Sequence, residues 1–193
     1  MSARISILEH FKKLAHFVGR EDRASFWPYA AVALIIIMVA GAIVFVPMMS
    51  RSLQAMQQFA TQHPEQATIS SGPGQYSISV AGAHPEFVSA RSMLLSLVAT
   101  FGVAIILYAA AVTRRLHDRG RSGLWGLMPL PFIIYSSARM PKIFASMGTG
   151  SQPDMAVFFS IFVSNLLYIV ALIWLIVLLA GPSEPKPNRY GMV

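Results

Sequence analysis

The chain contains no cysteine and little charge of either sign. Without cysteine it can form no disulfide, no covalent c-type haem attachment, no thiolate metal site and no cysteine nucleophile. Only 12% of its 193 residues are charged whereas 55% are hydrophobic, which is too apolar for an ordinary water-soluble domain. We therefore expect an all-α integral membrane protein that forms a single domain over residues 1–193.

The N-terminal segment, residues 1–28, lacks the apolar core and the small-residue cleavage site of a secretory signal peptide. Within it Ile7, Phe11, Leu14 and Val18 recur at helical spacing, while His10 and other polar residues occupy the remaining faces. The pattern predicts an amphipathic helix. This helix either lies in the cytoplasmic membrane interface or packs under the transmembrane bundle.

A transmembrane helix needs about 20 mostly apolar residues to cross about 30 Å of hydrocarbon. Residues 29–49, 92–113 and 155–180 meet this requirement. Residues 124–138 are fewer, and Pro129 and Pro131 each remove a backbone donor, so we interpret this stretch as a kinked span. A re-entrant segment is the alternative. The sequence thus predicts a four-helix transmembrane bundle.

Lysine and arginine are unevenly distributed among the connecting segments, and such residues resist translocation when they lie near the ends of spans. Eleven fall in residues 1–28, 114–123 and 181–193, whereas residues 50–91 and 139–154 together hold only four. Four crossings place the first three segments in the cytoplasm and the other two in the periplasm. We therefore expect both termini on the cytoplasmic side of a bacterial inner membrane.

The periplasmic insertion, residues 50–91, is the longest segment outside the predicted spans. Its glutamine-rich beginning is expected to prolong the first helix toward Pro64. The sequence Ser71-Gly72-Pro73-Gly74 is a turn signal, and Ile69 before it and Ile78 after it alternate with polar residues. A small β-hairpin is the predicted structure.

Two basic clusters flank the spans on the predicted cytoplasmic side, and we expect them to lie close together. Arginine binds carboxylate or phosphate with a planar fork of donors, so these residues either pair with Glu21, Asp22 and Asp118 or hold a phosphate or lipid headgroup. The candidate ligand-binding or headgroup-binding residues are Arg20, Arg23, Arg114, Arg115, His117, Asp118, Arg119 and Arg121.

Catalysis and metal binding find less support in the sequence. His117 and Asp118 are adjacent, and neighbouring side chains on a helix point about 100° apart, so their spacing alone makes no catalytic dyad. The five histidines show no spacing typical of a metal site. We assign no catalytic residue, no metal and no cofactor. The net charge of +7 is explained by topology and anionic lipid, so nucleic-acid binding is not expected.

Three motifs follow one another along the chain. They are Phe17-x-Gly19-Arg20-x-x-Arg23-x-x-Phe26-Trp27, then Arg114-Arg115-Leu116-His117-Asp118-x-Gly120-x-Ser122-Gly123, and finally Asn188-Arg189-Tyr190-Gly191. In this order they resemble the bacterial inner-membrane family known as domain of unknown function 805, which includes YhaH-like and YhaI-like proteins. The resemblance spans nearly the whole chain, but it implies class and location without an activity. The long insertion at residues 50–90 departs from the compact pattern.

Physically, the glycines of these motifs permit tight turns, and the arginines with Asp118 are expected to join both cytoplasmic loops and the tail into one polar layer. The leading hypothesis is a non-enzymatic membrane component whose layer engages anionic lipid headgroups, a membrane-protein partner or a second copy. One alternative is a transporter or membrane enzyme for a small phosphate-bearing or lipid substrate. Another is an accessory subunit of a larger membrane complex that docks through the insertion at residues 50–90.

Overall fold

The computed structural model describes residues 6–80, 90–148, 152 and 154–191. Its helices are α1 (Ile7–Lys12), α2 (Arg23–Gln62), α3 (Ala90–Asp118), the short 3-10 helix η1 (Gly123–Leu127), α4 (Leu130–Gly148) and α5 (Met155–Ala180). Two strands, β1 (Ala67–Gly72) and β2 (Gln75–Val80), lie between α2 and α3. The protein is therefore mostly helical, with one small sheet.

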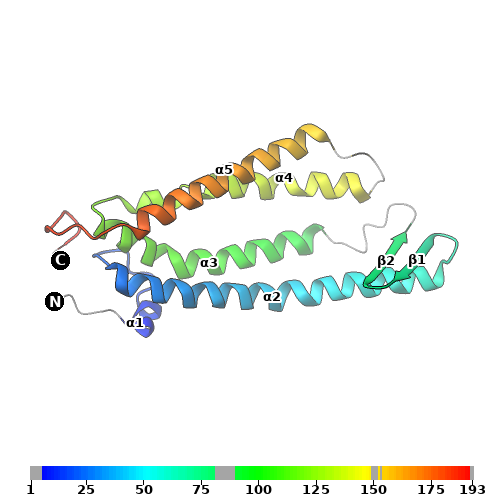
Figure 1. The fold of residues 1–193 in the computed structure, drawn as a ribbon, viewed down its shortest axis with the longest axis horizontal. Coiled ribbons are helices and arrows are strands. Elements are labelled where there is room, and N and C mark those ends of the chain that lie inside the picture. Colours follow the sequence, from blue (N-terminus) through cyan, green and yellow to red (C-terminus); the bar gives the residue numbers. More distant parts are fainter. Residues whose placement is uncertain (1–5, 81–89, 149–151, 153, 192–193) are drawn as a thin grey trace.

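The long helices run alternately up and down one bundle (Figure 1). At one end, which we call the α1 end, α1 and the start of α2 lie beside the ends of α3 and α5. At the opposite end, the hairpin end, β1 and β2 lie beside the end of α2. Segments distant in sequence, from Ser6 to Gly191, therefore converge at the α1 end.

Three helices are long and apolar enough to cross a membrane: α2, α3 and α5. At about 1.5 Å per residue, the 40 residues of α2 reach about 60 Å, roughly twice the hydrocarbon thickness. The predicted extension of this helix toward Pro64 is confirmed, because α2 ends at Gln62. Helix α4 is not among the three, and it carries Arg139 and Lys142 in its second half.

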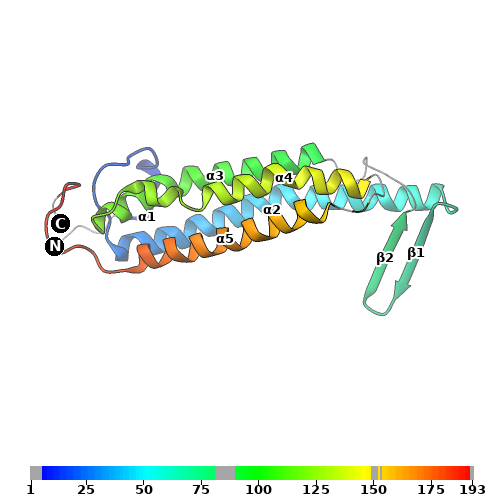
Figure 2. The same ribbon diagram turned by 90° about the horizontal axis from the view of Figure 1, so that it is seen from above.

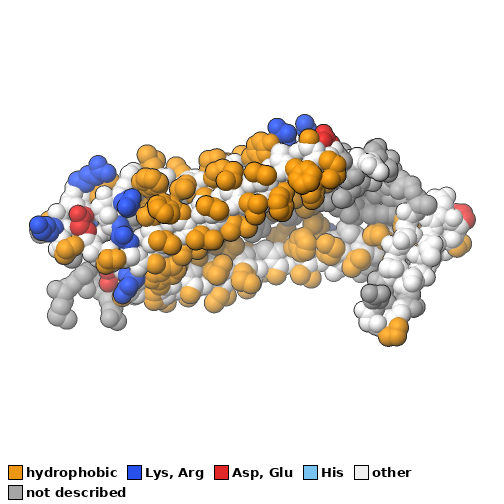
Figure 3. Space-filling view, turned by 45° about the horizontal axis from the view of Figure 1, so that its top comes forward, with side chains coloured by type: hydrophobic (Ala, Val, Ile, Leu, Met, Phe, Trp, Pro, Cys, Tyr) orange, Lys and Arg blue, Asp and Glu red, His pale blue; other side chains and the backbone are white. Residues whose placement is uncertain are grey.

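The hydrophobic core lies toward the α1 end. It is formed where small and aromatic residues of α2 meet the end of α3 and the last turns of α5: Phe26, Tyr29, Ala30, Ala33, Leu107, Ala111, Leu116, Leu175, Leu178 and Leu179. Elsewhere the helices present large apolar side chains outward, among them Ile35 and Ile43 of α2 and Ile173 of α5. Figure 3 shows this apolar surface along the length of the bundle. Such a surface is that of a membrane protein.

The predicted hairpin is confirmed as a structure. Its antiparallel strands pair Ile69 with Ile78 and Ala67 with Val80, which places the apolar residues on one face. The connection is Pro73-Gly74, and Gly74 has a φ of 77°, as the second central residue of a type II turn requires. The hairpin projects sideways from the bundle (Figure 2). Its periplasmic location remains a prediction, and residues 81–89 of the predicted insertion lie outside the described residues.

The N-terminal helix is shorter than its apolar spacing predicted. Ser6 begins α1 with a capping box that includes Glu9, and the helix ends at Lys12 rather than continuing to Val18. The reason is tertiary, because the carbonyls of Lys13 and His16 accept hydrogen bonds from Arg114. The prediction that His10 lies on a polar face is wrong, since its side chain is fully buried.

Candidate functional site at the α1 end of the bundle

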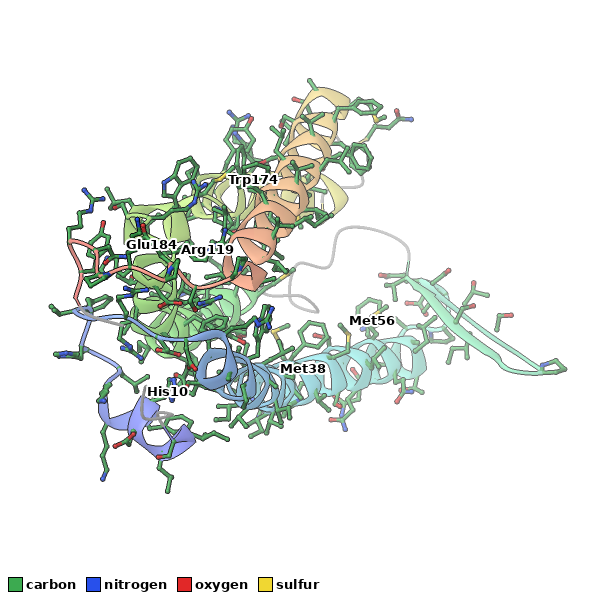
Figure 4. All side chains as sticks on the ribbon, turned by 60° about the vertical axis from the view of Figure 1, so that its left-hand side comes forward. His10, Met38, Met56, Arg119, Trp174 and Glu184 are labelled. Atoms are coloured by element: carbon green, nitrogen blue, oxygen red, sulfur yellow. The ribbon has the colours of Figure 1, made fainter. Side chains whose placement is uncertain are left out.

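Buried charges gather at the α1 end, on α1 and on the segments that carry the first two sequence motifs. We call His10, Arg20, Glu21, Arg114, Arg115 and Asp118 the polar layer. Helix α3 supplies the last three of these residues, the segment before α2 supplies Arg20 and Glu21, and α1 supplies His10. Figure 4 views the molecule with this end brought forward.

Arg115 lies at the centre of the layer, and its side chain is fully buried. It forms an ion pair with Asp118, and its Nε donates to the carbonyl of Leu179 at 2.9 Å. Asp118 also accepts from Arg20 Nε at 3.2 Å, and only 4–5% of these two side chains is exposed. Buried charges are tolerated when they are paired and hydrogen-bonded, and this group meets both conditions.

A second buried chain of charges begins in α1. His10 Nε2 lies 2.7 Å from Glu21 Oε1, and Arg114 Nε donates to Glu21 Oε2 at 2.9 Å. Nη1 of Arg114 donates to the carbonyls of Lys13 and His16. Helix α1 is therefore joined to the end of α3 through Glu21.

The C-terminal end of α5 is capped by arginines from α3. Arg115 and Arg119, one turn apart, donate to the carbonyls of Leu179 and Leu178, both at 2.9 Å. These acceptors lie in the last turn of α5, which contains no basic residue of its own. A Cβ at Gly181 would lie 1.4 Å from Arg119 Nη1, so the guanidinium occupies the space that a side chain would need.

The tail after α5 is held by the same layer. Arg20 donates to the carbonyls of Glu184 and Lys186, and Asn188 Nδ2 donates to the carbonyl of His117 at 3.0 Å. The His117 ring stacks on Tyr190, with centroids 3.7 Å apart and an interplanar angle of 5°. The expected joining of both loops and the tail by arginines and Asp118 is thus confirmed in the contacts.

The structure separates the predicted site residues into two groups. Arg20, Arg114, Arg115 and Asp118 are enclosed in the layer, and Arg119 caps α5, as described above. In contrast, Arg23 and Arg121 are exposed, and neither forms an ion pair within the part of the chain that the structure describes. Arg23 and Arg121 are therefore the members of the predicted set that lie exposed at the surface.

His117 and Asp118 do not form a dyad. His117 Nδ1 lies 3.3 Å from the carbonyl of Gly19, whereas the Asp118 carboxylate engages Arg20 and Arg115. Among the described residues, no group of three or more His, Asp or Glu side chains is placed to hold a metal ion. The expectation from spacing, that the two residues point in different directions, is confirmed.

An open pocket of about 570 Å³ lies between α4 and α5, and no residue of the polar layer is among those that line it. Its lining is largely apolar and aromatic, with Phe132, Tyr135 and Phe159 among its residues. The described residues that line it include no acid, base or histidine, so this pocket offers hydrocarbon contacts rather than acid–base chemistry.

Sequence reasoning identified Glu21 and Asp118 as partners of the arginines, and both are. Asp22, the third acid considered, instead caps α2, where its side chain accepts from the Ser25 N–H at 3.0 Å. The partnership of His10 with Glu21 was missed. The signal available was the helical spacing of His10 with Ile7 and Leu14 in the sequence, which puts the histidine among apolar residues and indicates burial.

Comparison with known proteins gives a family match. The sequence model of the family described as "Protein of unknown function (DUF805)" matches residues 14–192, nearly the whole chain. No curated protein and no solved structure matches.

Proposed function

Because the chain belongs to the DUF805 family, whose description states no activity, we propose a function from its geometry. The protein is a non-enzymatic component of a bacterial inner membrane that crosses the bilayer four times and engages anionic lipid headgroups through exposed cations at the α1 end. The observation that carries this proposal is the contrast between the enclosed arginines of the polar layer and the exposed Arg23 and Arg121, which form no ion pair among the residues that the structure describes.

Four crossings follow from the direction of the helices if α3 and α5 both span the membrane. The end of α3 lies against the end of α5, because Arg115 bonds Leu179 and Asp118 O accepts from Glu184 N. Two spans that end on the same side need a crossing between them, and α4 is the helix that runs back toward the hairpin end (Figure 1). Its cations Arg139 and Lys142 then lie near the periplasmic interface, where long side chains reach the headgroups.

The α1 end belongs on the cytoplasmic side by the positive-inside rule, since it gathers the larger share of the cations. Lys12, Arg23, Arg121, Lys186 and Arg189 are exposed there, and we call them the outer cations. Cations close to an anionic leaflet each contribute about 1 kcal/mol of attraction. The outer cations are therefore the proposed contacts for lipid phosphates, while the polar layer holds the segments that carry them.

A charge-neutralising comparison tests this proposal. The variant Lys12→Gln, Arg23→Gln and Arg121→Gln removes three outer cations without touching the layer, and native mass spectrometry of gently solubilised protein measures the anionic lipid that remains bound. A matched control, Arg51→Gln, Arg91→Gln and Lys142→Gln, removes three exposed cations from the segments predicted to be periplasmic.

We expect the first variant to lose most of its bound anionic lipid and the control to keep it. Equal retention in both variants, or an equal loss from both, would contradict a headgroup site at the α1 end.

The hairpin supports a second candidate function, that of an accessory subunit which binds a larger membrane complex through this element. Its two strands project sideways from the bundle and pair only with each other within the described residues (Figure 2). Deletion of residues 68–80 should then reduce the size of the complex solubilised from native membranes, while the shortened chain still enters the membrane. An unchanged size would remove this candidate.

A further inference from the structure

Helix α1 lies beside the bundle rather than beyond its end. The His10 ring stacks on Tyr29 with centroids 4.4 Å apart, and Phe11 meets the same ring edge-on at 5.6 Å. Tyr29 lies in the second turn of α2, so α1 is level with the first turns of that helix (Figure 1). Trp27, a residue type enriched at the membrane interface, lies in these turns.

The rotation of α1 about its own axis is fixed by buried contacts. His10 Nε2 lies 2.7 Å from Glu21 Oε1, and its Nδ1 lies 3.0 Å from the carbonyl of Ser6. The side chains of His10 and Glu21 are fully buried, and Arg114 holds the other oxygen of Glu21. His10 thus lies between α1 and α2 and determines which face of α1 turns outward (Figure 4).

The outward face combines apolar and basic side chains. Leu8 is two residues, or about 200°, from His10 around the helix, and 74% of it is exposed. Lys12 follows Leu8 by one turn on the same face and is also exposed. Ile7, beside Leu8, is 38% exposed. In a membrane interface, an apolar side chain reaches the acyl boundary while the long side chain of a lysine extends to the headgroups.

We infer that α1 is an interfacial anchor of fixed orientation, with Leu8 at the acyl boundary of the bilayer and Lys12 at the phosphate headgroups. The occupant of this face is lipid because α1 is level with the first turns of α2, and exposed apolar residues of α2 begin in the turns that follow, including Leu34 and Ile35. The inference rests on the proposed function in one respect, the placement of the α1 end at an anionic leaflet.

Site-directed spin labelling tests the anchor, and the absence of cysteine makes every introduced cysteine unique. The full chain with Leu8→Cys is labelled and reconstituted in vesicles of phosphatidylcholine alone or with added phosphatidylglycerol. Pro185→Cys, at an exposed position of the tail, is the aqueous control. Collision with a water-soluble nickel complex is measured for both labels.

The Leu8→Cys label should be several-fold less accessible to the nickel complex than the Pro185→Cys label, at every protein-to-lipid ratio. Equal accessibility would overturn the inference. Protection that appears only as the protein-to-lipid ratio rises would overturn it in favour of a second copy of the chain. If the Leu8→Cys label is equally protected from the nickel complex in vesicles with and without phosphatidylglycerol, the result supports the anchor but contradicts a preference for anionic lipid. The anchor and the proposed function can therefore fail separately.

Addition of His10→Ala to the Leu8→Cys chain tests the buried contacts. The spectrum of the label should show greater mobility, because α1 loses the contact that fixes its rotation. An unchanged spectrum would refute the positioning role of His10. If this variant fails to fold, the comparison of Leu8→Cys with Pro185→Cys still decides whether α1 is immersed.

Discussion

The substitution Arg115→Ala should destabilise this protein far more than removal of any exposed arginine. Its guanidinium is fully buried, pairs with Asp118, and donates to the carbonyls of Leu179 and Gly181 and to Ser183 Oγ. The substitution removes one side of a buried ion pair and leaves the end of α5 without those donors. Breaking a buried pair in this way costs about 3–5 kcal/mol.

Asp118 keeps Arg20 as a partner, so we expect a loss near the lower end of that range, about 3 kcal/mol. The free energy of unfolding is measured in mixed micelles by titration with a denaturing detergent, with tryptophan fluorescence as the signal. Arg121→Ala, at an exposed position, serves as the control and should change it by less than about 0.5 kcal/mol. The free energy of unfolding of Arg115→Lys should lie between those of the two alanine variants, since lysine keeps the charge but lacks the planar fork of donors.

Equal stability of Arg115→Ala and Arg121→Ala would refute the reasoning, because it would mean that the layer contributes nothing to the joining of α3, α5 and the tail. If Arg115→Ala is destabilised while Arg115→Lys is as stable as the original protein, charge rather than bidentate hydrogen bonding holds these segments together.

Three smaller effects can be measured in the same unfolding assay. Gly120→Ala should lower the free energy of unfolding by about 1–2 kcal/mol, because Gly120 has a φ of 67° and an added Cβ would lie 2.6 Å from Glu184 Oε2. In the control Gly102→Ala, in α3, the added Cβ meets open space and should cost nothing. Equal effects of the two substitutions would contradict this reasoning. Ser136→Ala should raise stability by about 1 kcal/mol, because its buried hydroxyl has no hydrogen-bond partner in the described part of the chain, and a clear loss would be inconsistent with an unsatisfied group. Asp22→Ala should lower stability by about 1 kcal/mol through loss of the α2 cap, and no change would show that the cap contributes nothing.

Much of the helical framework was predictable because it depends on local composition. The apolar runs within α2, α3 and α5 are long and free of charge, and hydrocarbon selects for this property whatever the tertiary contacts are. The hairpin was predictable from Pro73-Gly74, since few other pairs suit its turn. The beginning and end of α4 were harder to predict. Pro129 precedes this helix and Pro131 lies in its first turn, and the helix continues past Arg139 to Gly148, although charges usually mark the end of a span.

The polar layer was predictable in its residue types but not in its pairings. Arginines and acids at the ends of neighbouring helices indicate ion pairs, and Asp118 meets Arg20 across 98 positions of sequence as expected. Many of the remaining partners are backbone carbonyls, such as those of Lys13, Leu178 and Glu184. Every residue has a carbonyl, so no residue type marks these acceptors. For the same reason, the early end of α1 was not predicted.

Single-cysteine accessibility in whole cells tests the four-crossing arrangement most directly. The sites are Gln62 at the end of α2, Gln152 before α5, His16 after α1 and Pro185 in the tail, each introduced alone into the cysteine-free chain. A membrane-impermeant thiol reagent should label cysteines at positions 62 and 152 in intact cells, and cysteines at positions 16 and 185 only after the inner membrane is permeabilised. Labelling of position 185 from outside, or protection of position 152 while position 62 reacts, would contradict the arrangement.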